Sequence, residues 1–140
     1  MDYRKFNDTY LIRLDIDDEI VECLKTFCRD NLIALGTIRG FGTTKSAQIG
    51  LLETETKIYH PKAYSGDMEI TTLNGTISQM NGEVYLHIHA NLALPSHEVV
   101  GGHLDYAVVS AVAEIVVQSI NGVAEREYST VAGVNLLKFK

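Results

Sequence analysis

The chain has 140 residues, of which 46% are hydrophobic and 21% are charged. This composition excludes a disordered chain and predicts a single domain over residues 1–140 that is long enough to bury a core. Lys and Arg number 12 against 18 Asp and Glu, so the net charge is −6 at pH 7. The charge does not support DNA binding, which needs basic side chains gathered on one face.

The sequence predicts neither a membrane-spanning segment nor a secretion signal. No apolar run approaches the roughly 20 residues that span a bilayer, and the N-terminal MDYRKFND lacks the apolar segment of a secretion signal. We therefore expect a cytoplasmic protein. Cys23 and Cys28 fall on one predicted helix with side chains in different directions, which favours two buried free thiols over a disulfide.

The first predicted elements are a strand and a helix. Residues 9–15 alternate as a strand, and an acidic segment then opens a helix over about 18–30. Asp17 or Asp18 is the expected N-cap, because carboxylates suit the positive end of the helix dipole. The apolar residues of the helix form one stripe, which is typical of packing on a sheet, and Asn31 is expected to end it.

The middle of the chain predicts several short strands. Residues 32–40 indicate a buried strand that closes on a glycine-rich turn at 40–44. A GxG pattern here is weak evidence for a phosphate site, because the next segment alternates as a strand and opens no helix. A turn cluster is predicted at 60–66. Further strands are predicted at 46–53, 56–60 and 68–79.

The later part of the chain also favours strands. Asn81-Gly82 predicts a tight hairpin after 68–79. Residues 106–120 are rich in β-branched side chains, which favours a strand buried on both faces or at a subunit interface. The tail is expected to add one or two short strands, in which the packed side chains are Leu136, Leu137 and Phe139.

Site-like chemistry is concentrated in residues 81–105, which contain four of the five histidines. Within 84–94, the side chains of Tyr85, His87, His89 and Asn91 share one face of an alternating strand. The chain is expected to reverse near Ser96. A turn centred there pairs residues whose numbers sum to 192, so that His103 lies opposite His89 on the same face.

This register predicts that His87, His89 and His103 converge on one metal ion. Neutral imidazole is a preferred ligand of zinc, copper, iron and nickel, and three protein ligands leave a fourth position open to water, substrate or a neighbouring chain. Two alternatives stay open. A bulge at Gly101-Gly102 would turn His103 to the other face, and an H-x-H pair is often only the solvated side of a strand.

The sequence resembles a stand-alone prokaryotic PPC domain, the plants and prokaryotes conserved domain that also occurs in plant AT-hook nuclear-localised proteins. The resemblance depends on LHIHANLAL followed by GGHL, and it covers roughly residues 9–118. It implies an α+β fold with a mostly antiparallel sheet and one main helix, and a homotrimer. It also implies a divalent metal, foremost zinc, on His87, His89 and His103.

The resemblance implies a metal-binding, homo-oligomeric protein with a regulatory or DNA-binding role. The chain departs from the plant proteins because it is acidic and has no Arg-Gly-Arg-Pro hook. The alternative is a zinc-dependent hydrolase or lyase that uses water held by the three histidines. Such an enzyme needs an acid or base, for which the candidates are Glu69, Glu83, His97 and Asp105.

Asp105 has a second possible role, because its position favours a carboxylate that orients one of the histidines. His97 in the predicted turn and His60 before Pro61 are expected to be solvated side chains outside the site.

Overall fold

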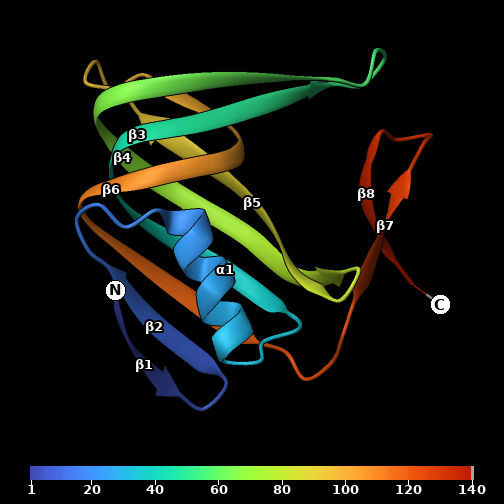
Figure 1. Ribbon diagram of the computed structural model, residues 1–140. Coiled ribbons are helices and arrows are strands. Elements are labelled where there is room, and N and C mark those ends of the chain that lie inside the picture. Colours follow the sequence, from blue (N-terminus) through green and yellow to red (C-terminus); the bar gives the residue numbers. More distant parts are fainter. Residues whose placement is uncertain (140) are drawn as a thin grey trace.

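The computed structural model describes residues 1–139 and has the predicted α+β fold, with one helix in that range against a mostly antiparallel sheet (Figure 1). The elements in chain order are β1 (Asp2–Phe6), β2 (Thr9–Leu14), α1 (Ile20–Asp30), β3 (Gly36–Glu53), β4 (Ile58–Met80), β5 (Glu83–Ala93), β6 (Val99–Ser119), β7 (Glu125–Ser129) and β8 (Val134–Lys138).

Four long strands, β3 to β6, pair with one another in a closed ring. β3 pairs with β4 and β6, and β5 pairs with the same two strands, all antiparallel. β2 pairs with β6 further along its length, and β1 adds to β2 as an outer strand. From His89 to Ala93 β5 is paired on both sides, so the side chains of that segment have fixed positions relative to β4 and β6.

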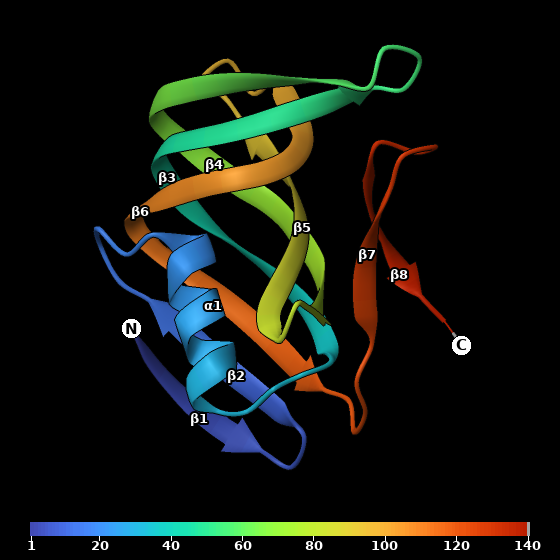
Figure 2. The same cartoon turned by 45° about the vertical axis from the view of Figure 1, so that its right-hand side comes forward.

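The helix α1 packs on β5 and β6 and covers one face of the sheet (Figures 1 and 2). Its predicted apolar stripe is buried, and the ring of Phe27 packs edge-on to the ring of Tyr10 on β2, with centroids 5.1 Å apart. The largest fully buried side chains are Ile12, Leu14, Ile20, Leu24, Phe27, Ile70, Leu73, Ile77, Ile88, Leu92, Val109 and Ile115.

The N-cap of α1 is Glu19, so the predicted capping by Asp17 or Asp18 is wrong. Asp17 has a left-handed φ of 72° and pairs with Lys45. Asp18 accepts a hydrogen bond from the backbone N–H of Asp15 at 2.8 Å. Both aspartates are therefore used in the turn that precedes the helix. Asn31 ends the helix as predicted.

Two predicted turns lie inside long strands. Residues 40–44 continue β3 through irregular pairing, where glycine permits close contact: a Cβ on Gly42 would lie 2.6 Å from Cα of Ala113. Residues 60–66 belong to β4, where Pro61 pairs with Gly50 of β3. β5 pairs only with β4 residues from Glu69 onward, so Pro61 lies on a free edge that needs no N–H donor.

The C-terminal hairpin of β7 and β8 stands beside the main body (Figures 1 and 2). Its strand pairing with the body is a single parallel bridge between Gln79 and Glu125. The prediction that the tail packs its apolar side chains is wrong, since Leu136, Leu137 and Phe139 are 46%, 37% and 79% exposed. These apolar side chains are exposed because the hairpin makes few contacts with the main body.

Two sequence predictions concern the cysteines and membranes. Cys23 and Cys28 are both free, with Cys28 buried and Cys23 half-buried. None of the helical structure within residues 1–139 is long and apolar enough to cross a bilayer.

Candidate metal centre

The strand register at the histidines is the predicted one. His89 pairs with His103 and Leu92 with Val100, as expected for numbers that sum to 192. The chain reverses between Leu94 and Glu98, where the N–H of Leu94 donates to the Glu98 carbonyl at 2.8 Å. The bulge at Gly101-Gly102 that would have turned His103 away does not occur, because pairing is regular from Ala93 to His89.

The three imidazoles converge. Their ring centroids are 5.1 Å apart for His87 and His89, and 5.5 Å for each pair that includes His103. One ligand nitrogen from each ring lies within 4.8 Å of the others, and the Nε2 atoms of His87 and His89 are 3.2 Å apart. Such spacing suits three nitrogens around one ion at about 2 Å from each.

Two glycines on β6 let neighbouring chain segments approach His103. A Cβ on Gly102 would lie 2.5 Å from the carbonyl oxygen of Gly50 on β3, and a Cβ on Gly101 would lie 2.2 Å from the side-chain oxygen of Asn91. The glycine pair thus makes room for β3 and for an asparagine side chain. Close packing of β3 on β6 fixes the backbone that carries the third histidine.

The surroundings keep two of the rings neutral. Burial lowers the pKa of His87, and the positive charge of Arg126 lowers it further. Burial also lowers the pKa of His103, although the carboxylate of Asp105 acts in the opposite direction. His89 is the exposed member of the cluster. Neutral imidazole is the form that can coordinate a metal, and these two rings are in that form at pH 7.

Asp105 lies next to the cluster, on the side of His103. Its Oδ1 is 3.8 Å from Nε2 of His103 and accepts a hydrogen bond from the hydroxyl of Tyr59 at 2.8 Å. Its Oδ2 accepts one from the side chain of Gln48 at 2.9 Å. The carboxylate is therefore fixed from both sides, with Tyr59 on β4 and Gln48 on β3.

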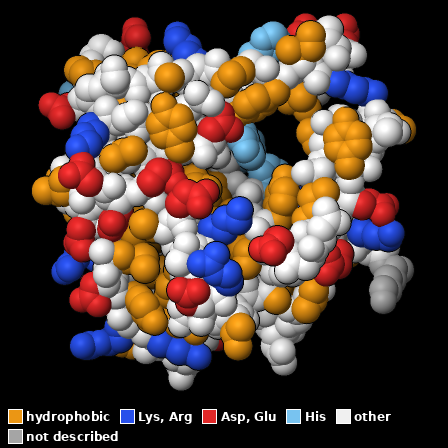
Figure 3. All heavy atoms as spheres, in the orientation of Figure 1, with side chains coloured by type: hydrophobic (Ala, Val, Ile, Leu, Met, Phe, Trp, Pro, Cys, Tyr) orange, Lys and Arg blue, Asp and Glu red, His pale blue; other side chains and the backbone are white. Residues whose placement is uncertain are grey.

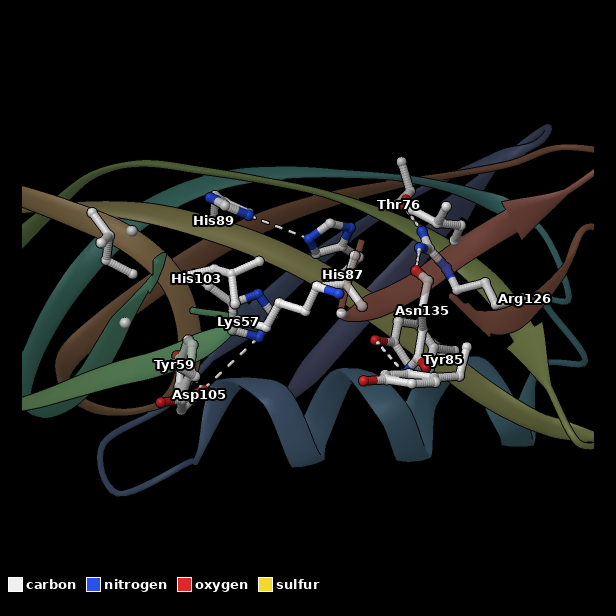
Figure 4. Close-up of a pocket in the computed structure, with 18 of the residues that line it drawn as sticks. Lys57, Tyr59, Thr76, Tyr85, His87, His89, His103, Asp105, Arg126 and Asn135 are labelled. Carbon is white, nitrogen blue, oxygen red and sulfur yellow. Dashed lines mark hydrogen bonds and ion pairs between the residues drawn. The ribbon is translucent and has the colours of Figure 1, made fainter. Parts of the chain in front are cut away.

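The histidines open into a cavity of about 930 Å³ between the main body and the C-terminal hairpin. Figure 3 shows histidine side chains on the inner wall of this hollow, with hydrophobic side chains around its rim. The labelled residues in Figure 4 place His87 between the other two histidines and Arg126. The cavity thus brings an arginine of β7 to the same space as residues of β5 and β6.

Arg126 and Tyr59 are site residues that the sequence did not suggest. Arg126 is only 8% exposed. It lies in the segment EREYS, whose alternation is typical of an ordinary edge strand, and Tyr59 lies in a segment of unremarkable composition. No local signal points to either residue, because both reach the site by long-range packing of a hairpin.

The other candidate residues are not brought to the cluster. His60 pairs with Glu53 at the outer end of the β3 and β4 hairpin, with its Nε2 3.0 Å from Oε2. His97 lies in the turn after β5 and lines a different hollow together with Glu69. Glu83 is exposed at the start of β5. Among the four proposed acid or base residues, only Asp105 lines the histidine cavity.

Comparison with known proteins identifies the family. The model of the Plants and Prokaryotes Conserved (PCC) domain, also abbreviated PPC, matches residues 1–121. The chain belongs to the PPC domain family. The resemblance seen in the histidine motif is thereby confirmed for most of the chain, as is the α+β fold that it implied.

Three solved structures resemble this PPC protein over almost its whole length. A candidate DNA-binding protein from Bacteroides thetaiotaomicron is 32% identical with a TM-score of 0.96, covering 99% of this chain and 96% of its own. A PPC protein from Pyrococcus horikoshii is 31% identical (TM-score 0.86; 99% and 94%). A metal-containing protein from Archaeoglobus fulgidus is 28% identical (TM-score 0.88; 99% and 99%). Among curated proteins no match is found.

Proposed function

We propose that this PPC protein binds one divalent metal ion, foremost zinc, through His87, His89 and His103. The observation that carries the proposal is the convergence of three imidazole nitrogens within 4.8 Å of one another. The donor set fits zinc, which accepts nitrogen ligands and leaves a position open when only three protein groups bind it. The similar protein from Archaeoglobus fulgidus is described as metal-containing.

The proposal is tested by the metal content of the purified protein. Elemental analysis is expected to give about one metal ion per chain for the wild type and far less for His89→Ala. His97→Ala is the matched control, since His97 lines a different hollow. Equal metal content in wild type and His89→Ala, or no metal in the wild type after incubation with zinc, contradicts the proposal.

We further propose that the chain forms a homotrimer. The family resemblance implies that state, and exposed apolar side chains on the strands supply surface for it, since such surface commonly marks association sites. These side chains include Phe41, Ile58 and Val112. Light scattering during size exclusion is expected to give about three times the chain mass of 15.5 kDa. A monomer at micromolar concentration contradicts the trimer.

A regulatory role with DNA binding is the biological function carried over from the family. A similar protein from Bacteroides thetaiotaomicron is described as a candidate DNA-binding protein. Against this stands the net charge of −6, and basic and acidic side chains are interspersed on the face in Figure 3. Titration of an AT-rich duplex at two salt concentrations tests the role, because phosphate contacts weaken steeply with salt. If no salt-dependent binding is observed, the DNA-binding role is contradicted.

The cavity favours one second candidate, a zinc-dependent hydrolase or lyase. A bound zinc ion would supply Lewis-acid chemistry at the histidine end. Asp105 and Tyr59 then stand beside that end, and Arg126 lies further along the cavity, so charged and hydroxyl groups surround the space open to a substrate. A metal-dependent turnover on ester or phosphoester panels supports this candidate, and its loss in Asp105→Asn at a zinc concentration that saturates the variant supports it further.

A further inference from the structure

The guanidinium of Arg126 is buried without a carboxylate partner. Arg126 is 8% exposed, and no carboxylate oxygen of residues 1–139 forms an ion pair with it. A buried charge is costly unless an opposite charge or several hydrogen bonds compensate it. Within residues 1–139, no anion balances this charge.

The guanidinium is nevertheless held firmly in place. Its Nε donates to Ser78 Oγ at 2.8 Å, one terminal nitrogen donates to the Asn135 carbonyl at 2.9 Å, and the other donates to Thr76 Oγ1 at 3.3 Å. The ring of Tyr85 lies 4.9 Å from the guanidinium carbon. Arginine has five N–H groups, so two of them remain without a partner among residues 1–139.

Other groups in the cavity also suit an anion. Lys57 lines the cavity, and its ammonium uses one bond, to the Thr130 carbonyl at 2.6 Å. The hydroxyl of Tyr85 accepts a hydrogen bond from Asn135, which leaves its own proton available to donate. Asp105 is the only acidic residue among those that line the cavity, and its carboxylate is already bonded to Tyr59 and Gln48.

The walls between these polar groups are largely apolar. They are formed by side chains of the two hairpins that flank the cavity, among them Leu51, Leu52, Val134, Leu136 and Leu137. A site of this size with apolar walls and a few fixed polar groups is typical of small-molecule binding. Inorganic phosphate would satisfy the arginine and leave these walls unused, whereas an organic acid would use both.

We propose that the cavity binds a small organic acid, with a carboxylate on Arg126 and the opposite end of the molecule at the histidine cluster. A planar guanidinium with two free N–H groups matches the geometry of a carboxylate. The second end of the ligand rests on the proposed metal site, so a dicarboxylate of three to five carbons provides the simplest probe.

Isothermal titration of the zinc-loaded protein with malonate, succinate and glutarate tests the proposal. At least one of them is expected to bind with a Kd below about 10 mM, and its diamide is expected not to bind. Arg126→Gln should weaken binding by about ten-fold or more, as for other losses of charge-assisted hydrogen bonds. Lys62→Gln removes the same charge from an exposed position of β4 that does not line the cavity, and should change the Kd by less than about two-fold.

Metal content measured on the same samples separates the two proposals. Zinc-loaded protein that binds none of the three acids overturns the organic-acid site and leaves the metal site standing. Arg126→Gln with full zinc content and unchanged Kd also overturns it, as does phosphate binding as tightly as the best acid. If the protein holds no metal but an acid still binds through Arg126, the metal-site proposal is contradicted and the organic-acid site stands.

A measurement on the wild type covers the case in which Arg126→Gln does not fold. The Nε–H of Arg126 donates to Ser78, which gives its resonance a distinct environment in a ¹H–¹⁵N spectrum. Addition of the tightest-binding acid is expected to shift this resonance and to leave that of Arg39 in place. An unshifted Arg126 resonance at saturation overturns the proposal.

Discussion

Nε2 of His103 lies 3.8 Å from Oδ1 of Asp105, and the same oxygen accepts a hydrogen bond from the hydroxyl of Tyr59. A carboxylate beside a metal-binding histidine orients the ring and raises its basicity. Tyr59 and Gln48 hold that carboxylate from the two strands of one hairpin. The carboxylate that faces the third histidine is therefore held in place by both β3 and β4.

Asp105→Asn is expected to weaken metal binding by about 10–100-fold, because the neutral amide supports the histidine less well than the carboxylate. Competition with a chelator of known affinity measures the change. Asp67→Asn is the control, since it removes an exposed carboxylate that does not line the histidine cavity. Equal affinities for Asp105→Asn and wild type would show that Asp105 has no orienting role.

Gly102→Ala is expected to destabilise the protein by about 2 kcal/mol or more, because its Cβ would press on the backbone of Gly50 at 2.5 Å. Gly101→Ala is the matched control. Its Cβ would press on the end of the Asn91 side chain, which can turn aside, and would meet backbone only at 3.1 Å, at the Ala90 oxygen, so the smaller loss is expected there. Urea denaturation of both variants measures the free energy of unfolding, and equal losses contradict the backbone contact.

The histidine hairpin could be predicted because its signals are local. Pro95-Ser96-His97 interrupts one alternating run, and that interruption fixes which residues of 84–94 and 99–105 face each other. Convergence of the three imidazoles follows from this register alone. The helix and most strands were predictable on similar grounds, since the stripe of α1 and the alternation of the strands match the structure, whereas the α+β fold was implied by the family resemblance.

The errors have a different origin. Glycines at 40–42 and Pro61 were interpreted as turn signals, yet the glycines allow close packing of β3 on β6 and the proline lies on a free edge. Arg126 was missed because nothing in its own segment distinguishes a buried arginine from an exposed one. Its role arises only when the C-terminal hairpin contacts β4 and β5.

Glu19→Ala is expected to cost about 2 kcal/mol of stability, because one carboxylate serves both the helix and the sheet. Its oxygens accept from the N–H groups of Val21 and Glu22 at the start of α1 and from Ala107 on β6. Thermal and urea unfolding measure the loss. Glu22→Ala, which removes a carboxylate from the first turn of the same helix, is expected to cost much less, and equal costs contradict the bridging role.

The two cysteines are expected to differ in reactivity. Burial raises the pKa of Cys28 to about 12, so its thiolate is scarce in the folded protein, whereas Cys23 is only partly buried. Ellman's reagent at pH 8 should label Cys23 slowly and Cys28 only after unfolding. In Cys23→Ala no thiol should react until urea is added, and prompt labelling of that variant contradicts the burial of Cys28.

The same raised pKa predicts that Cys28 makes stability depend on alkaline pH. In the unfolded chain the thiol ionises near its ordinary pKa of about 8.5, but in the folded protein it stays protonated until about pH 12. The contribution of Cys28 to the free energy of unfolding is therefore complete below pH 8. It falls as the pH rises, by about 2 kcal/mol at pH 10. Urea denaturation of wild type and Cys28→Ala at pH 8 and pH 10 isolates this effect, since both proteins share all other titrating groups. The wild type should lose more stability than the variant over that interval, and an equal loss would mean that Cys28 ionises as readily in the folded protein as in the unfolded chain.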